Sequence, residues 1–476
     1  MTGSNDLERD TARSLPAMKM PRDTPALWPL RPWLRAEGGN VAIILALSLL
    51  PLIGLIGMGA DYYRGLSYKS RLDGAADSAA LAAITTAKSY INDNSQSETE
   101  PNLTNDAVAA GIAQAKKVFV VNAAAASLSV PTTPVVTLSR SGQTFSSNVT
   151  YSGQTETSFG KLFGVGNLNI GGTSASSLTM GKYLDFYIAL DVSGSMGIPT
   201  TGSGQNQLAA INPDQKSSYP SGCVFACHYP GYKGYGLTRN ADGTPYIPLR
   251  VDSVGNALQT LLQIAKQTMT LQNQYRIGIY PFIVHTVQAA ALSADFTIAN
   301  QVAGNLAAYL DNGDCTGKPT DTNNGGRGCG GTHFETIGTD MANYTRTAGD
   351  GSSSTSPQPF LFLVTDGADN GQTYSPFNGS TPQVPGSSFK TYCTSLKSRG
   401  YTISVLYIPY VPIQNPNASF AGNEDGKVNA IIPQIPGILQ SCASSGFFFT
   451  ANSPQDITSA MQAMFAQALQ AARLTQ

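Results

Sequence analysis

The sequence predicts an α/β fold whose C-terminal part contains a central, mostly parallel sheet with helices on both faces. Short apolar runs of the kind that parallel sheets bury on both sides are the first observation, and helix-periodic segments between them are the second. Strands that alternate with helices indicate this class of fold. The third observation is a long uncharged run near the N-terminus, which predicts a separate membrane helix. The expected strands are 183–190, 275–284, 360–365 and 402–408.

Composition excludes several classes of protein. Only 12% of the 476 residues are charged, and 29 Lys and Arg against 30 Asp and Glu leave a net charge of −1. A nucleic-acid partner is not expected, because phosphate binding needs clustered basic side chains. The hydrophobic content of 41% excludes a highly charged disordered chain. The abundance of small neutral residues, including 48 Gly, suits an envelope or extracellular protein.

Residues 41–60 (VAIILALSLLPLIGLIGMGA) contain no charged side chain. A run of about 20 residues at roughly 1.5 Å each covers the ~30 Å hydrocarbon core of a bilayer. The alternatives are a buried core helix, which is uncommon at this length without a polar stripe, and a cleaved signal peptide, which would be shorter and begin earlier. We therefore expect one uncleaved transmembrane helix at 41–60, preceded by a cytoplasmic tail at 1–40.

The orientation of this helix depends on the cysteines. Basic residues within about twenty positions of the two ends of the span are balanced, so the positive-inside rule gives a tie. Paired cysteines persist in oxidising compartments, and all of them follow the span. We therefore expect the N-terminus in the cytoplasm and the large C-terminal part in the periplasm or outside the cell. The six cysteines are Cys223, Cys227, Cys315, Cys329, Cys393 and Cys442.

Three regions are expected beyond the membrane helix. Residues 61–122 contain good helix formers, with an alanine-rich face that suits close packing, and predict a helical stalk. Residues 123–181 are rich in β-branched residues, Ser, Thr and Gly, and predict a small β-rich region. The α/β domain is expected at 182–476. Residues 197–249 and 311–330, rich in Gly and Asn, are expected to be loop insertions in that domain.

Oxygen-bearing side chains follow two of the expected strands. Asp191, Ser193 and Ser195 come directly after the first strand, Asp366 follows the strand 360–365, and Thr332 precedes an expected helix. Ligands bind at the carboxyl ends of strands in open α/β sheets, and oxygen donors suit Mg²⁺, Ca²⁺ or Mn²⁺ rather than Zn²⁺. Alternatively, the aspartates only cap turns and the serines bond to local backbone. All five residues together favour a divalent metal site.

This pattern resembles a known family. DVSGSM after an apolar strand, GGT before a helix and LVTDG on a later strand resemble the von Willebrand factor type A domain, a Rossmann-like fold with a metal-ion-dependent adhesion site. The resemblance implies that Ser193 and Ser195 bind the metal directly, and that Thr332, Asp191 and Asp366 bind it directly or through water. It also implies an open coordination position for an Asp or Glu of a partner protein, with Mg²⁺ as the expected ion. The insertion after Ser195 leaves open whether this face is covered.

The N-terminal region resembles a second family. GNVAII at 39–44, the apolar span, DYYR at 61–64 and the Ala-rich tract up to about residue 88 are similar to TadG-like proteins of bacterial Flp (tight-adherence) pilus assembly. The resemblance implies a non-catalytic, inner-membrane protein of the cell envelope that works with other pilus assembly components. A pilus-independent surface adhesin is an alternative. A metal-dependent hydrolase that activates water is another, although no general base is recognisable.

Six cysteines allow fifteen pairings. Proximity in sequence suggests Cys223–Cys227 and Cys315–Cys329, and the family resemblance makes Cys393–Cys442 plausible. The alternative for the first pair is a zinc site made by Cys223, Cys227 and His228 with a ligand from elsewhere.

Overall fold

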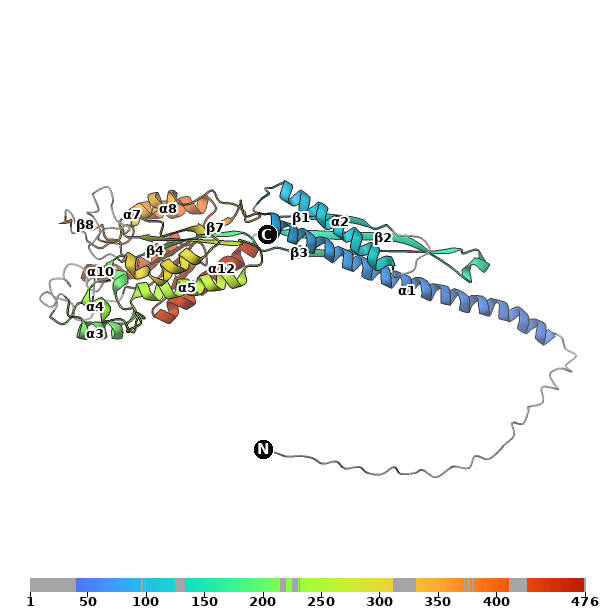
Figure 1. The fold of residues 1–476 in the computed structure, drawn as a ribbon, viewed down its shortest axis with the longest axis horizontal. Coiled ribbons are helices and arrows are strands. Elements are labelled where there is room, and N and C mark those ends of the chain that lie inside the picture. Colours follow the sequence, from blue (N-terminus) through green and yellow to red (C-terminus); the bar gives the residue numbers. More distant parts are fainter. Residues whose placement is uncertain are drawn as a thin grey trace, which may run out of the picture. The chain divides into compact units, whose positions relative to one another are not determined.

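The chain folds as two compact units, and Figure 1 draws the helices and strands that they contain. The computed structural model describes residues 40–474 apart from 96, 99, 125–132, 215–219, 225–229, 231, 311–330, 372, 375–376, 379–380 and 411–425. The first unit comprises the described part of Met1–Ser67 together with Gln154–Ile170. The second comprises Tyr68–Gly153 and Gly171–Gln476.

The first unit contains the start of helix α1 (Asn40–Asn94). By length and composition, this helix could cross a membrane, and it is the one such helix among the described residues. Most residues of 41–60 are exposed. Gly54 and Gly57, together with Asp61 just after this range, form a buried stripe along the helix. The loop between strands β2 (Thr144–Glu156) and β3 (Asn167–Thr179), which includes the short helix η2 (Gly160–Phe163), lies against this stripe.

In the second unit, the remainder of α1 packs against α2 (Asn102–Ala124) through small side chains. Gly111 of α2 lies so close to the α1 backbone that a Cβ there would be 2.6 Å from the Ala83 carbonyl oxygen. Strand β1 (Val135–Ser141) pairs antiparallel with β2, and the three strands form a sheet in the order β1-β2-β3. The stalk and the β-rich region were expected at these positions.

The C-terminal part contains a six-stranded sheet in the order β11-β10-β7-β4-β5-β6. The pairs β11–β10, β10–β7, β7–β4 and β4–β5 are parallel, and the edge strand β6 is antiparallel to β5. The predicted α/β class with a mostly parallel sheet is therefore confirmed. The strands are β4 (Leu184–Asp191), β5 (Tyr275–Phe282), β6 (Ala290–Ser293), β7 (Gln358–Thr365), β10 (Thr402–Tyr407) and β11 (Phe448–Thr450).

Helices cover both faces of this sheet, which explains why its central strands are mostly apolar, and the buried Asp185 of β4 is paired with Arg276 of β5 at 2.6 Å. Phe186 and Ile188 of β4 belong to one core with α5 and α12, whereas Tyr187 and Ala189 belong to another with α7, α8 and α11. The first layer is α5 (Arg250–Thr268), α6 (Thr297–Gly304), η4 (Leu306–Tyr309) and α12 (Pro454–Leu474). The second is α7 (Phe334–Ala342), α8 (Ser387–Ser398) and α11 (Ile435–Cys442).

The first insertion is more ordered than the loop expected from its composition. After the turn η3 (Gly194–Gly197), helix α3 (Gly202–Ile211) begins where the Thr201 hydroxyl caps the Gly204 N–H at 3.1 Å. A bridge between Pro199 and Leu249 closes the base of the insertion. The second insertion, 311–330, lies outside the described residues. The remaining elements are α4 (Lys233–Gly236), β8 (Thr373–Tyr374), β9 (Phe377–Asn378), α10 (Gly426–Ile431) and η7 (Ile432–Gln434).

Candidate metal centre

The candidate site lies between β4 and β7, where the order in which the chain adds strands to the sheet reverses. The chain passes from β4 through α5 to β5 on one side, and from β7 through α8 to β10 on the other. The loops that follow β4 and β7 therefore lead to opposite sides of the sheet, and ligands of open α/β sheets bind at the carboxyl ends of the strands at such a point. Asp191 ends β4, and Asp366 directly follows β7.

Asp191, Ser193 and Ser195 form one hydrogen-bonded group. Asp191 Oδ1 accepts from the Ser193 N–H at 3.0 Å and from the Ser193 hydroxyl at 2.6 Å. The Ser193 and Ser195 hydroxyl oxygens lie 3.2 Å apart. All three residues are buried. The turn after β4 thus gathers one carboxylate and two hydroxyls.

Burial distinguishes this turn from an ordinary aspartate turn. Asp242 makes the same local bonds, accepting from the Thr244 N–H at 2.9 Å and the Thr244 hydroxyl at 2.6 Å, but it is exposed. Asp191 is 1% exposed, and burial together with the neighbouring Asp366 carboxylate raises its pKa. Capping of a turn explains Asp242 fully, but it does not explain why a second carboxylate is buried beside Asp191.

Thr365 is a site residue that the sequence reasoning missed. Its hydroxyl donates to Asp191 Oδ2 at 2.6 Å and accepts from the Gly367 N–H at 2.9 Å. The pairing of Leu190 with Val364 brings the ends of β4 and β7 side by side, and this contact follows from that register. Its position next to Asp366 was the available signal. Both oxygens of Asp191 are therefore held by hydroxyl groups before any ligand binds.

Arg250 is the second residue that was missed. Its guanidinium donates to Asp366 Oδ2 at 2.8 Å, to the Pro409 carbonyl at 2.9 Å and to the Ser195 carbonyl at 3.4 Å. It begins α5, where its N–H donates to the Ile198 carbonyl at 2.9 Å across the base of the insertion. Its spacing of four residues from Val254 puts it on the buried helix face, which was the available sequence signal.

Asp366 leaves one carboxylate oxygen available. Its Oδ1 is buried and has no hydrogen-bond partner of good geometry among the described residues. Burial raises the pKa of Asp366, and the Arg250 guanidinium opposes this rise. The Ser195 hydroxyl and the Ala368 N–H also favour the charged form of the Asp366 carboxylate and so act to lower its pKa. A buried carboxylate oxygen needs a partner. Together with the hydroxyls of Ser193 and Ser195, it forms a set of hard oxygen donors that fits Mg²⁺, Ca²⁺ or Mn²⁺.

Thr332 reaches the same edge of the sheet through its backbone. Its N–H donates to the Asn370 carbonyl at 2.8 Å, and the Asn370 N–H donates back at 2.9 Å. The next residue, His333, donates its N–H to the Ile283 carbonyl just beyond β5. Thr332 is buried and is placed between the loops that follow β5 and β7. The structure therefore brings Thr332 to the same edge as Asp191, Ser193, Ser195 and Asp366.

The described residues do not bring together a set of His, Cys and acidic side chains that could bind zinc. No group of three or more His, Cys, Asp or Glu side chains among them is placed to hold a metal ion. Cys223 is disulfide-bonded, which removes the thiolate required by the zinc alternative, while Cys227 and His228 lie outside the described residues. His333 pairs with Glu335 at 2.8 Å, and His285 pairs with Asp340 at 3.0 Å.

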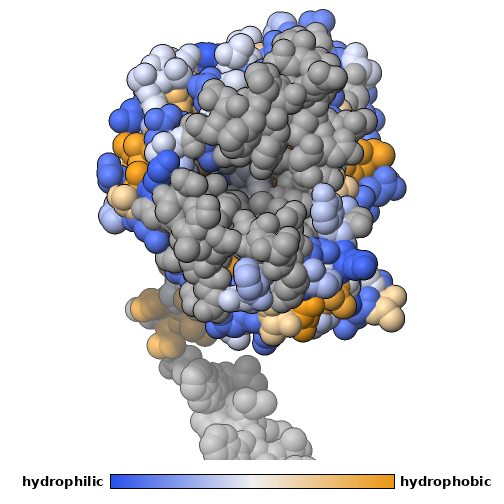
Figure 2. Space-filling view, turned by 90° about the vertical axis from the view of Figure 1, so that its left-hand side faces the viewer, coloured by the Kyte–Doolittle hydropathy of each residue, from blue (hydrophilic) through white to orange (hydrophobic). Residues whose placement is uncertain are grey.

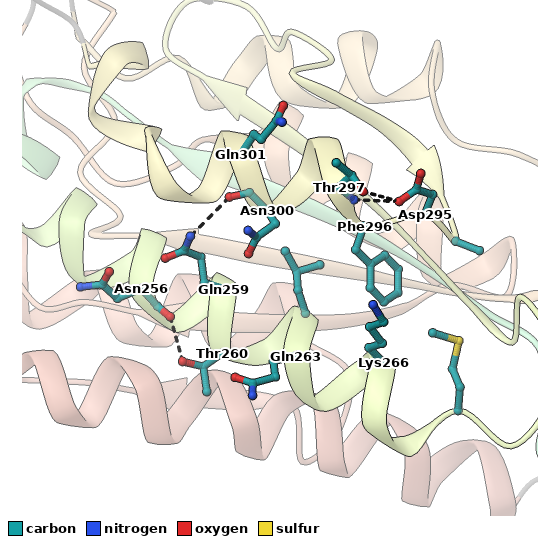
Figure 3. A pocket seen from close by; sticks show the side chains of 13 residues that line it. Asn256, Gln259, Thr260, Gln263, Lys266, Asp295, Phe296, Thr297, Asn300 and Gln301 are labelled. Carbon is teal, nitrogen blue, oxygen red and sulfur yellow. Dashed lines mark hydrogen bonds between the residues drawn. The ribbon is translucent and has the colours of Figure 1, made fainter.

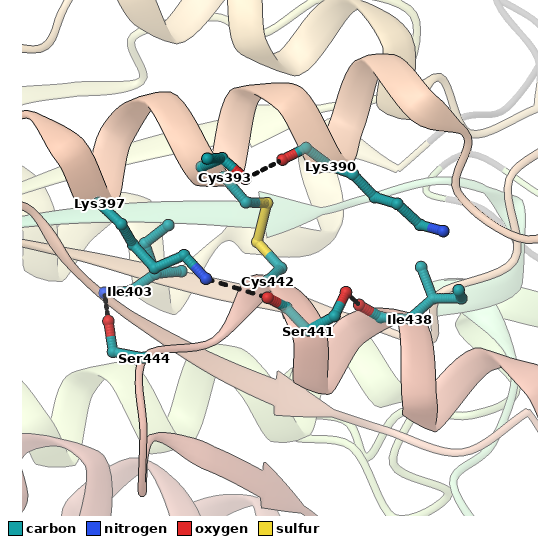
Figure 4. Close-up of a disulfide and its surroundings, with 9 residues drawn as sticks. Lys390, Cys393, Lys397, Ile403, Ile438, Ser441, Cys442 and Ser444 are labelled. Carbon is teal, nitrogen blue, oxygen red and sulfur yellow. Dashed lines mark hydrogen bonds between the residues drawn. A yellow bond between two sulfur atoms is a disulfide. The ribbon is translucent and has the colours of Figure 1, made fainter.

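Cys393 and Cys442 form a disulfide that joins α8 to the end of α11 (Figure 4). Their Cα atoms are 5.1 Å apart. The Lys397 ammonium donates to the Ser441 carbonyl at 3.0 Å beside the disulfide. Cys315 and Cys329 lie outside the described residues, as does the partner of Cys223.

One end of the C-terminal part presents a mostly polar described surface, and a polar groove lies elsewhere on this part of the chain. Figure 2 faces the end at which α3, α4 and α10 lie in Figure 1, and its coloured residues are mostly hydrophilic, with hydrophobic residues in separate spots. A groove of about 970 Å³ lies between α5 and α6 (Figure 3). It is lined by Asn256, Gln259, Asn300 and other residues, and none of the five candidate ligands lines it. The groove is therefore separate from the Asp191 site.

The fold and the site define the class of this protein. The parallel sheet, the DVSGSM turn after β4 and the acidic turn after β7 are the features in which the C-terminal part resembles a von Willebrand factor type A domain, and the chain also contains a helix long enough to span a membrane. Residues 39–89 match the family model described as putative Flp pilus-assembly TadE/G-like, which confirms the predicted resemblance of this region. No curated protein sequence matches the chain.

Several solved structures are similar to this chain. The vWF domain of the type V pili tip protein Mfa5 from Porphyromonas gingivalis is 13% identical, covering 61% of this chain and 96% of its own, with a TM-score of 0.32. BatB from Bacteroides thetaiotaomicron is 13% identical, covering 60% and 99%, with a TM-score of 0.30. The pilus adhesin SpaC from Lactobacillus rhamnosus GG is 11% identical over 71% of this chain, with a TM-score of 0.32, and the chain spans 34% of that adhesin.

Proposed function

We propose that this chain is a membrane-anchored component of Flp/Tad-type pilus assembly that binds a partner protein through a divalent cation held at the Asp191 site. The observation that carries the proposal is the buried Asp366 Oδ1, which lacks a hydrogen bond of good geometry among the described residues and lies near the serine hydroxyls. A cation would stabilise this oxygen. The TadE/G-like match at 39–89 supports the assignment to pilus assembly.

Each site residue has a distinct role in this proposal. Ser193 and Ser195 would bind the ion directly, and Asp191, Thr332 and Asp366 would bind it directly or through water. Mg²⁺ is the expected ion, and Ca²⁺ or Mn²⁺ would also accept these oxygen donors. Thr365 and Arg250 would orient the two carboxylates from outside the ligand set, as partners of metal ligands commonly do.

The charges at the site favour an acidic partner. Asp191 and Asp366 are each negative when ionised, and Arg250 contributes one positive charge, so the protein side chains leave one net negative charge. A bound divalent cation would supply two positive charges and a Lewis-acidic centre. The remaining positive charge would attract an Asp or Glu of the partner. Arg250 therefore increases the preference of this site for an anion. The role is binding, without a catalytic step.

The proposed topology is a single-pass inner-membrane protein with residues 1–40 in the cytoplasm, a span at 41–60 and residues 61–476 in the periplasm or outside the cell. The Cys393–Cys442 disulfide and the disulfide-bonded Cys223 support an oxidising environment for the C-terminal part. Alkaline phosphatase fused after Gln476 is expected to be active. Activity of a reporter that works only in the cytoplasm would overturn this orientation.

The functional experiment compares Asp191→Ala with Asp242→Ala in cells that assemble Flp pili. Asp242 is a matched control, because it makes the same turn bonds at an exposed position. We expect Asp191→Ala to be produced at normal levels but to abolish pilus assembly, and Asp242→Ala to have no effect. Normal assembly with Asp191→Ala would contradict the proposal. Loss of surface attachment with intact pili would instead favour a pilus-independent adhesin.

A further inference from the structure

The loop between β2 and β3 has an apolar tip that nothing in the first unit covers completely. Leu162 is 76% exposed, Phe163 52%, Val165 45% and Phe159 39%. Four apolar side chains within seven positions are an unusual use of an exposed loop, since connecting loops are normally polar. This tip, residues 159–165, therefore needs an apolar partner.

The tip is attached to the part of α1 that is long and apolar enough to cross a membrane. A Cβ on Gly57 would lie 2.3 Å from Phe159 Cγ, and a Cβ on Gly54 would lie 2.3 Å from Phe163 Cζ. The two rings therefore rest directly on the helix backbone. Gly54 lies six positions before Ala60, the end of the apolar run, which corresponds to about 9 Å along a helix.

Asp61 fixes the tip to this part of α1. Its carboxylate accepts hydrogen bonds from the N–H groups of Ser158 at 2.9 Å, Phe159 at 2.7 Å and Gly160 at 2.8 Å. Asp61 is buried and follows directly after the apolar run. Since three bonds connect the loop to one helical position, the tip cannot slide along α1 without breaking them.

Several backbone N–H groups of the tip have hydrogen-bond partners within the first unit. Unsatisfied backbone N–H and C=O groups are costly in lipid, so a loop that enters a bilayer needs such internal partners. Beyond the three bonds to Asp61, the N–H groups of Leu162, Gly164 and Val165 donate to carbonyls within the loop at 3.0, 3.2 and 2.9 Å. The one charged side chain at the tip, Lys161, reaches back to Glu156 at 3.0 Å, as a lysine near a membrane surface does.

We infer that residues 159–165 insert into the lipid bilayer beside α1, in the leaflet nearest Asp61. The partner is the acyl-chain region of the lipid, because the tip is fixed against a helix face that would lie in the same region. The chain would then contact the membrane through two elements, the transmembrane helix and this hairpin tip. A second element restricts rotation of the helix about its axis, which a single span does not.

The test uses the full chain in phosphatidylcholine–phosphatidylglycerol liposomes, with the environment-sensitive fluorophore NBD attached to single introduced cysteines. Leu162→Cys reports on the tip, Leu47→Cys on the membrane helix, and Thr150→Cys on an exposed position of β2. Thr150 lies six positions before the end of β2, about 20 Å along the strand. We expect doxyl-labelled acyl chains to quench most of the fluorescence at positions 47 and 162 and little at position 150.

Two outcomes would overturn the inference. Quenching at 47 without quenching at 162 would overturn the inference while leaving the membrane span intact. A label at 162 that is shielded from water but not quenched by lipid would indicate a protein neighbour, and would also overturn it. Gly57→Leu provides a second check, because its side chain must displace the Phe159 ring. This variant should reduce quenching at 162 and leave quenching at 47 unchanged.

Discussion

Arg250 donates a hydrogen bond to Asp366 at 2.8 Å, and neither side chain is exposed to solvent. Arg250 begins α5 and Asp366 follows β7, so the pair joins the start of this helix to the loop that carries a candidate metal ligand. Asp366 uses Oδ2 for this pair and keeps Oδ1 for another partner. The Arg250 guanidinium therefore compensates the buried charge of Asp366 and leaves Oδ1 available to another ligand.

Arg250→Met should strongly destabilise the metal-free protein. Removal of one partner leaves an uncompensated buried charge, and such changes lower the free energy of unfolding by about 3–5 kcal/mol. Urea denaturation of the purified full chain in EDTA measures this effect. The double variant Arg250→Met/Asp366→Asn removes both charges and should recover part of the stability. Equal losses in the single and double variants would show that the pair is not coupled.

Thr365→Val should weaken cation binding by orienting Asp191 less well. The variant keeps the shape of the side chain but loses the 2.6 Å hydrogen bond to Asp191 Oδ2. Loss of a bond to a metal ligand commonly reduces metal affinity by about 10- to 100-fold. Calorimetric titration with Mg²⁺ measures the change, and Thr365→Ser, which retains the hydroxyl, should bind nearly as well as the wild type. Unchanged affinity in Thr365→Val would remove Thr365 from the site.

Asp369→Asn should flatten the dependence of stability on pH. Burial and the nearby Glu335 carboxylate raise the pKa of Asp369 to about 7, against the opposing effect of His333. The folded state therefore retains a proton that the unfolded chain releases near pH 4, so this contribution to stability is complete below about pH 4 and is lost as the pH rises through about 7.

The slope attributable to Asp369 is at most about 1.4 kcal/mol for each pH unit in this window. Unfolding free energies of the wild type and Asp369→Asn measure this slope at about pH 4.5, 6 and 7.5, which lie near the two ends and the middle of the range from pH 4 to 7. The variant should gain stability relative to the wild type as the pH increases. Parallel curves for the two proteins would show that Asp369 titrates normally.

Replacing the Cys393–Cys442 disulfide by two alanines should destabilise the C-terminal domain. The bond connects positions 49 residues apart, and closing a loop of this size contributes about 2–4 kcal/mol. The urea midpoint of Cys393→Ala/Cys442→Ala should decrease under oxidising conditions, without any added reductant. An unchanged midpoint would mean that the packing of α8 against α11 alone determines stability there.

The sequence allowed prediction of features that depend on local patterns. β4 carries apolar side chains on both faces, so its burial between helices could be inferred, and the Asp191–Ser195 turn is contiguous. Contacts that depend on strand register or on the path of an insertion could not. Thr365 reaches Asp191 because β4 and β7 pair in one register. Arg250 reaches Asp366 because the Pro199–Leu249 bridge returns the chain to the site.

The edge strand β6 also went unpredicted, since four residues give too short a periodic signal. The same limit applies to the tip of the β2–β3 loop. Its apolar residues are visible in the sequence, but their attachment to Gly54, Gly57 and Asp61 depends on the tertiary fold.

Calorimetric titration of Mg²⁺ into the purified, metal-free full chain tests the central claim most directly. The wild type and the matched control Asp242→Ala should each bind one ion with a saturable heat signal. Asp191→Ala should give none, while its circular dichroism spectrum stays that of the wild type. Absence of binding by the wild type, or equal binding by the folded Asp191→Ala variant, would contradict the assignment of this site.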